Sequence, residues 1–234
     1  MHITPPITLV LLPGMDGTGD LFAPLVNALP STVKTVIVRY PTEKIMSYGE
    51  LTTYALAYIP KNSPYILLGE SFSGPIAISL AAQADYQLKG LILACTFASN
   101  PRPLLSKLSF LVPAMPINKW LFPSACKVLM GKFYDNNVRS LLAATLSKVP
   151  PKTMRARLDS VINVDYSEKL KNIQAPILYL QARHDYLVPA SAAKLIQQCA
   201  KNVELFTLEA PHLLLQVAAK EAALHIQTFI KKTL

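Results

Sequence analysis

Short apolar runs alternate with helix-like stretches along most of this chain, and this alternation restricts the folds that it can form. Short continuous apolar strands separated by helices are typical of a parallel sheet covered by helices on both faces. The sequence therefore predicts an α/β fold with a mostly parallel sheet flanked by helices. The predicted strands lie in ITLVLL (7–12), TVKTVIVRY (32–40), YILLG (65–69), LKGLILAC (88–95), APILYLQA (175–182) and NVELFTL (202–208). The predicted helices lie at 21–29, 48–59, 75–84, 190–200 and 213–231.

The middle of the chain does not continue this alternation of strands and helices. From residue 101 to residue 165 there is no strand-like run, and five prolines fall between Pro101 and Pro123. The rest of this segment has helical patterning. We therefore predict one domain whose core comprises residues 1–100 and 166–234, with residues 101–165 inserted as a helical cap between two late strands.

The loops that follow four of the predicted strands carry the candidate catalytic residues. Ligands of a parallel α/β sheet bind beyond the carboxyl ends of its strands, so these loops are expected to meet. They supply Ser71, Asp185 and His212, in that order. A serine hydroxyl becomes a good nucleophile when an imidazole removes its proton, and a carboxylate orients the imidazole. The sequence therefore predicts a Ser–His–Asp triad, with the backbone N–H groups of Met15 and Phe72 as donors to an oxyanion.

Other titratable residues compete for these roles. His184 is the rival base, but it lies on the loop expected to supply the acid, and no carboxylate follows at the right strand end. Asp159 and Asp165, at the end of the insertion, are rivals of Asp185. The loop after LILAC, the alternative place for the acid in this kind of fold, contains no acid. We interpret Glu70, beside the serine, as a structural residue.

These motifs resemble those of the α/β-hydrolase superfamily. The resemblance rests on the motifs LLPGMDGTGDLF, LLGESFSGPIA, HDYLVP and APHLLLQ. It covers residues 7–95 and 175–230, and the insertion resembles the superfamily's variable lid. The chain departs from the common pattern at Pro13-Gly14, where many members have His-Gly, and at Ser73, where G-x-S-x-G has its second glycine. The resemblance implies a serine hydrolase that cleaves carboxylic esters through an acyl-enzyme without a cofactor. Thioesterases, acyltransferases and non-catalytic binding proteins share the fold, so these alternatives stay open.

The positive charge is concentrated in the insertion. Residues 102–160 contain ten Lys or Arg against two Asp, whereas the whole chain has a net charge of +9. This charge either keeps an apolar cap in solution or attracts an acidic partner: an acyl carrier protein, acyl-CoA or an anionic membrane surface. By resemblance to esterases that cleave the methyl ester of pimeloyl–acyl carrier protein, the candidate carrier-binding residues are Arg139, Lys152, Arg155 and Arg157. No motif indicates nucleic-acid binding.

Composition and termini limit the remaining classes. Three cysteines at wide, irregular spacing favour neither a disulfide framework nor a zinc site. The chain lacks a signal-peptide pattern and any apolar run long enough to cross a membrane, so a cytoplasmic location is expected. GMDGTG lacks the spacing of phosphate and dinucleotide loops, and we expect no cofactor and no metal.

Overall fold

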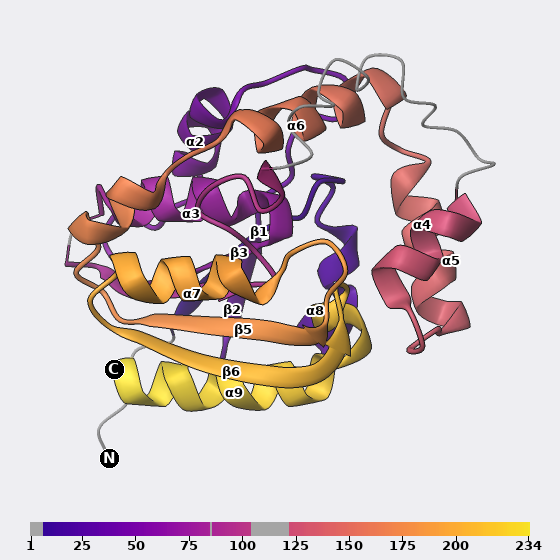
Figure 1. Ribbon diagram of the computed structural model, residues 1–234. Helices are drawn as coiled ribbons and strands as arrows, with labels where there is room; N and C mark the ends of the chain where they lie inside the picture. Colours follow the sequence, from indigo (N-terminus) through magenta and orange to yellow (C-terminus); the bar gives the residue numbers. More distant parts are fainter. Residues whose placement is uncertain (1–6, 85, 104–121) are drawn as a thin grey trace.

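The computed structural model describes residues 7–84, 86–103 and 122–234 (Figure 1). Its centre is a six-stranded sheet in the order β2-β1-β3-β4-β5-β6, in which all neighbouring strands are parallel. The predicted α/β fold with a parallel sheet is therefore confirmed. The strands are β1 (Thr8–Leu12), β2 (Lys34–Ile37), β3 (Tyr65–Glu70), β4 (Leu88–Ala94), β5 (Ile177–His184) and β6 (Val203–Pro211).

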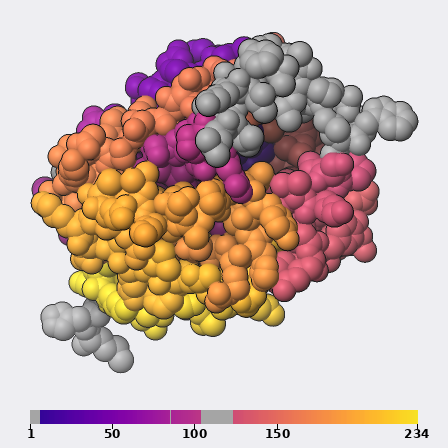
Figure 2. All heavy atoms as spheres, in the orientation of Figure 1, coloured from indigo at the N-terminus to yellow at the C-terminus, as the bar shows by residue number. Residues whose placement is uncertain are grey.

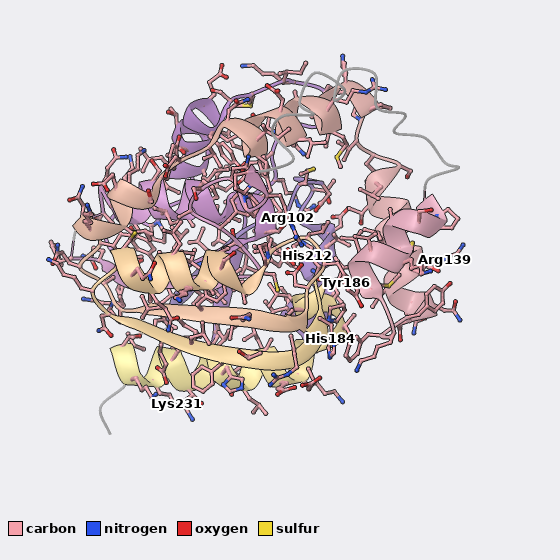
Figure 3. All side chains as sticks on the ribbon, in the orientation of Figure 1. Arg102, Arg139, His184, Tyr186, His212 and Lys231 are labelled. Atoms are coloured by element: carbon pink, nitrogen blue, oxygen red, sulfur yellow. The ribbon has the colours of Figure 1, made fainter. Side chains whose placement is uncertain are left out.

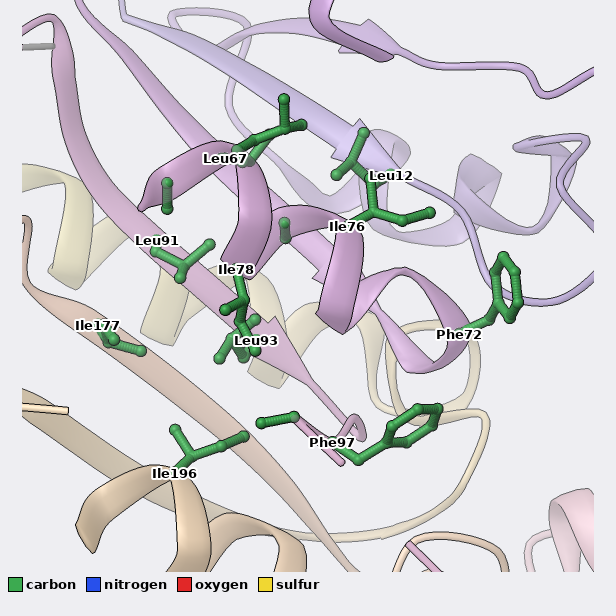
Figure 4. Packing of buried hydrophobic residues seen from close by; sticks show 14 of the residues in the cluster. Leu12, Leu67, Phe72, Ile76, Ile78, Leu91, Leu93, Phe97, Ile177 and Ile196 are labelled. Atoms are coloured by element: carbon green, nitrogen blue, oxygen red, sulfur yellow. The ribbon is translucent and has the colours of Figure 1, made fainter. Parts of the chain in front are cut away.

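The two faces of the sheet bury alternate residues of each strand. Val10 and Leu12 of β1 pack into one apolar cluster, whereas Leu9 and Leu11 pack into the other. This period of two places apolar side chains on both faces, which explains why the strands read as continuous apolar runs. Figure 4 shows part of the first cluster, where Leu12 and Leu67 lie near helix α3.

Helices cover both faces (Figure 1). One face carries α2 (Tyr48–Leu56), α3 (Gly74–Ala81) and α7 (Ala190–Cys199). The other carries α1 (Ala23–Ala28) and α9 (Ala219–Thr233), which contact each other. The predicted helix 213–231 is divided, because Ala218 leaves the helical region at φ −108° and ψ 35° between α8 (Leu214–Val217) and α9. No proline or glycine marks this break in the sequence.

The insertion leaves the core between β4 and β5, as predicted. Its described part consists of α4 (Phe122–Met130), α5 (Asn136–Leu146) and α6 (Pro151–Asn163). The predicted cap residues 104–121 lie outside the described residues, and the proposed division into core and cap stays a prediction. At its base, an antiparallel bridge joins Ser99 to Asp165, and Tyr166 N donates to Ala98 O at 2.7 Å.

The cap helices α4 and α5 pack beside the carboxyl end of the sheet. Cys126, Met130 and Leu142 form a small apolar cluster with Leu21 and Leu213 of the core. In the space-filling view, these helices (rose) lie next to the part of the chain that follows α6 (orange to gold) (Figure 2). The cap thus places apolar side chains beside the loop that carries His212.

Candidate active site

Ser71 follows β3 directly and has φ +48°, a left-handed conformation that residues with a Cβ rarely adopt. The surrounding hydrogen bonds hold this turn. Thr96 Oγ1 donates to the carbonyl of Ser71, and the Tyr48 hydroxyl donates to the carbonyl of Phe72 at 3.1 Å. The turn between β3 and α3 is therefore fixed by side chains from α2 and from the loop after β4.

Two glycines make this tight turn possible. A Cβ at Gly74 would lie 1.9 Å from Thr96 Oγ1, and one at Gly69 would lie 2.7 Å from the Cβ of Ala77. Ser73 takes the position where the common motif has its second glycine. It is fully buried and donates to the carbonyl of Pro13, so it links the turn to the loop after β1. Serine is small enough for this position, and its hydroxyl has a partner there.

The structure brings Ser71, His212 and Asp185 together at the carboxyl edge of the sheet. The Ser71 Oγ lies 2.9 Å from His212 Nε2, and His212 Nδ1 lies 2.7 Å from Asp185 Oδ2. The other Asp185 oxygen accepts the N–H groups of Leu187 and Val188, each at 2.8 Å. His212 is only 6% exposed. A hydroxyl, an imidazole and a carboxylate are thus aligned in the order that nucleophilic catalysis requires.

The rival residues lie elsewhere. His184 Nε2 is 2.9 Å from the carboxylate of Glu209, an exposed pair outside this alignment. Asp165 accepts hydrogen bonds from Ser167, and its pKa is lowered by those bonds. Asp159 is exposed on α6. None of the described rivals contacts His212.

The loop after β1 passes next to the serine. A Cβ at Gly14 would lie 4.0 Å from the Ser71 Cβ, which shows how closely this backbone approaches. The loop closes on itself through Gly17, which has φ +71° and donates its N–H to the carbonyl of Gly14 at 3.0 Å. Asp16 Oδ2 accepts the N–H and the hydroxyl of Thr18. The assignment of the Met15 and Phe72 N–H groups as oxyanion donors stays a prediction.

A buried carboxyl lies under this loop. Glu70 is 5% exposed, and burial raises its pKa to about 7. Its Oε1 accepts from Gln216 Nε2 at 2.9 Å, while Oε2 lies beside Gly14 without a hydrogen bond of ordinary geometry. Gln216, which the sequence did not single out, also donates to the carbonyl of Leu21 at 3.1 Å. Glu70 directly precedes Ser71 in the chain, and its carboxyl is held by Gln216.

Arg157 is not on the cap surface, and its assignment to carrier binding is wrong. It is 3% exposed and donates to backbone carbonyls of the core. Burial lowers its pKa, against the nearby charge of Asp16. On α6, Thr153, Arg157 and Val161 share one helical face at a spacing of four, and all three are buried. Counting charges along the segment could not reveal this burial.

Two more basic residues of the insertion are also used to attach it to the core. Arg102 donates to the carbonyls of Tyr186 and Leu187, at 2.7 and 3.2 Å, in the loop of Asp185 (Figure 3). Lys148 pairs with Asp20 at 2.7 Å. Part of the positive charge of the insertion is therefore occupied by contacts within the protein.

The other candidate carrier-binding residues differ in position. Arg139 is exposed on α5 and points away from His212 (Figure 3). Lys152 is exposed at the start of α6, and Arg155 is half-buried. Their role stays a prediction. Within residues 7–84, 86–103 and 122–234, no three His, Cys, Asp or Glu side chains are grouped as metal ligands. No helix in the same ranges could span a membrane.

The chain resembles known proteins in sequence at low identity. No family model matches the chain. It is 26% identical over 219 residues to a pimeloyl-[acyl-carrier protein] methyl ester esterase of Vibrio cholerae, covering 86% of this chain and 85% of the relative. It is 22% identical over 175 residues to a pyrrolizixenacetamide deacetylase of Xenorhabdus hominickii. That match covers 71% of this chain and only 65% of the deacetylase, just under two thirds of its length.

Solved structures agree on the architecture at low sequence identity. An esterase from Exiguobacterium antarcticum superposes with a TM-score of 0.83 at 13% identity, covering 96% of this chain and 92% of the other. An enol-lactonase from Burkholderia xenovorans superposes with a TM-score of 0.82 at 15% identity, covering 99% of this chain and 94% of the other. The chain therefore has the α/β-hydrolase fold, as the resemblance of its motifs predicted.

Proposed function

We propose that this protein is a serine hydrolase that cleaves carboxylic esters with a hydrophobic acyl or alcohol part. The observation that carries the proposal is the hydrogen-bonded series from Ser71 Oγ through His212 to Asp185, at 2.9 and 2.7 Å. The two relatives reported above are named as a deacetylase and an esterase, and both names agree with hydrolysis at a carbonyl group.

The mechanism follows from the positions of these groups. His212 Nε2 takes the proton of Ser71 as the Oγ attacks the ester carbonyl, and the carbonyl oxygen becomes an oxyanion. His212 then gives that proton to the departing alcohol, which leaves an acyl group on Ser71. Water, deprotonated by the same imidazole, attacks the acyl-enzyme; the acid leaves and the serine regains its proton. Asp185 holds the imidazole and stabilises its positive charge.

The oxyanion is assigned to the N–H groups of Phe72 and Met15. Phe72 follows the nucleophile, and Met15 lies in the loop that approaches Ser71. Removing one such donor costs on the order of 10²–10³ in rate in other enzymes. These two N–H groups are therefore expected to account for a large part of the rate enhancement.

The test compares the wild type, Ser71→Ala and Ser63→Ala on p-nitrophenyl esters of short to long acyl chains. Ser63 is exposed in the loop before β3 and serves as the matched control. We expect Ser71→Ala to lose at least about 10³-fold in kcat, and Ser63→Ala to retain full activity. A fluorophosphonate probe, read by intact mass, should modify the wild type and not Ser71→Ala. Activity that survives in Ser71→Ala, or a wild type that neither turns over any ester nor reacts with the probe, would contradict the proposal.

A second candidate substrate is an ester linked to an acyl carrier protein. The 26% identity to the pimeloyl-carrier esterase over most of both chains favours it, as does the basic insertion. Charge reversal at Arg139, Lys152 or Arg155 should then lower the turnover of carrier-linked esters and spare p-nitrophenyl esters. Equal effects on both substrates would favour a merely solubilising charge. A thioesterase or acyltransferase with the same triad would instead show preference for a thioester or for an added alcohol acceptor.

A further inference from the structure

The buried Arg157 reaches from the insertion to the loop after β1. It lies on α6 of the insertion, 142 residues from Met15, and its guanidinium contacts that loop directly. A Cβ at Gly17 would lie 2.5 Å from Nη1 and 2.8 Å from Nη2. The loop is thus shaped around the guanidinium, and the glycine is needed both for its φ of +71° and for this close contact.

The guanidinium binds two consecutive carbonyls of the loop. Its Nη1 donates to Met15 O at 2.8 Å and to Asp16 O at 2.7 Å, and Nη2 donates to Pro41 O at 3.3 Å. The Tyr40 ring lies 5.9 Å from the guanidinium carbon. Arg can hold several oxygens at once because its N–H groups form a rigid planar fork, whereas an ammonium has no fixed fork.

With Arg157 in place, four consecutive carbonyls of this loop have donors. Pro13 O accepts from the hydroxyl of Ser73, and Gly14 O accepts from the N–H of Gly17. Arg157 holds the next two, those of Met15 and Asp16. The C=O and N–H of a trans peptide point in opposite directions. Since Gly14 O points into the turn toward Gly17, the Met15 N–H of the same peptide points out of the turn.

We infer that Arg157 is a positioning residue for the oxyanion donor Met15 N–H. This inference rests on the proposed serine-hydrolase function. Ser73 fixes the loop before the donor peptide, and Arg157 fixes it after that peptide. The cap therefore takes part in the reaction through a buried side chain that does not touch the substrate. A donor that is held rigidly stabilises the oxyanion without having to reorganise during the reaction.

The test uses Arg157→Met, Arg157→Lys and the control Lys127→Met. Methionine fills the space of the side chain without charge or donors, and lysine keeps the charge but loses the fork. Lys127 is an exposed basic residue of α4, so its replacement removes one cap charge without touching the loop. Each purified variant is assayed well below its thermal midpoint for kcat and KM on p-nitrophenyl butyrate, for the rate constant of fluorophosphonate attachment to Ser71, and for inhibition by an alkylboronic acid.

We expect Arg157→Met to lower kcat and the labelling rate about 10- to 100-fold, less than the loss of a whole donor, with KM within twofold. Boronate inhibition should weaken by a similar factor, because the tetrahedral adduct uses the same donors. Arg157→Lys should fall between Arg157→Met and the wild type, and Lys127→Met should match the wild type.

Three results would overturn the inference. A folded Arg157→Met with wild-type kcat and labelling rate would show that the residue only stabilises the fold. A rise in KM with unchanged kcat would assign it to substrate binding. A wild type without turnover or labelling would refute the proposed function itself, whereas an active wild type beside an unaffected variant refutes only the role of Arg157. If Arg157→Met does not fold, the same readouts on Arg157→Lys decide.

Discussion

Replacing Glu70 by Gln should change how the stability of the protein depends on pH. Glu70 is buried beside Ser71, and burial raises its pKa to about 7, with Asp16 adding to the rise and Gln216 and His212 opposing it. Gln keeps an oxygen for the hydrogen bond from Gln216 Nε2 and cannot ionise. The substitution therefore removes a buried charge at alkaline pH while leaving the shape of the side chain almost unchanged.

The direction and size of the effect follow from proton linkage. The folded-state pKa lies above the ordinary value of 4.5, so the folded protein holds a proton that the unfolded chain releases between those pH values. The stability that Glu70 contributes is full below about pH 4.5 and is lost as the pH rises through about 7. The difference between the two pKa values corresponds to a loss of about 3 kcal/mol of unfolding free energy in total. Of this loss, about 2.5 kcal/mol falls between about pH 5 and 8.

Urea unfolding followed by far-ultraviolet circular dichroism measures this directly. The unfolding free energy of Glu70→Gln minus that of the wild type should increase by about 2.5 kcal/mol from about pH 5 to 8. If the substitution also alters packing, it shifts the unfolding free energy equally at every pH, so the change with pH stays the same. Glu50→Gln is the matched control: Glu50 is exposed, its pKa is lowered by Ser47, and its contribution is lost only in more acidic solution. A difference for Glu70→Gln that stays flat with pH would refute the reasoning.

Two further substitutions probe the turn that carries Ser71. Ser71→Gly should be more stable than Ser71→Ala by about 1 kcal/mol, because both lose the hydroxyl but only glycine adopts φ +48° without strain; equal urea midpoints would contradict this. Gly74→Ala should destabilise the protein by about 2 kcal/mol or more, because its Cβ would lie 1.9 Å from Thr96 Oγ1. Adding Thr96→Ala should restore part of that loss, and full additivity in a double-mutant cycle would show that the two side chains do not collide.

The sheet and the three aligned residues were predictable because their signals are local. Each strand is a short run buried on both faces, so its apolar composition marks it without knowledge of its neighbours. Ser71 follows the end of β3 directly, Asp185 that of β5 and His212 that of β6. The parallel arrangement then brings these ends to one edge. Distance along the chain, 141 residues between Ser71 and His212, does not matter for such a prediction.

The residues that the sequence concealed act through long-range contacts. Arg157 looks like one more cap charge until its acceptors are known, and those are carbonyls of residues 15, 16 and 41. Backbone carbonyls are present at every position and leave no mark in a sequence. The break at Ala218 is hidden for a related reason, since both helical pieces continue the apolar pattern and no breaker residue separates them.

The closed base of the insertion has a consequence for how this cap could be exchanged between related enzymes. The bridge from Ser99 to Asp165 brings the two ends of the insertion together, so a different cap could be grafted there with little strain on the core. Such a graft would nevertheless remove Arg157 and leave three core carbonyls without their donor. A transplanted cap must therefore supply a guanidinium at the equivalent depth, or the recipient loop must be redesigned around its loss. In this chain, the ends of the insertion allow it to be exchanged, but its buried Arg157 ties it to the loop after β1.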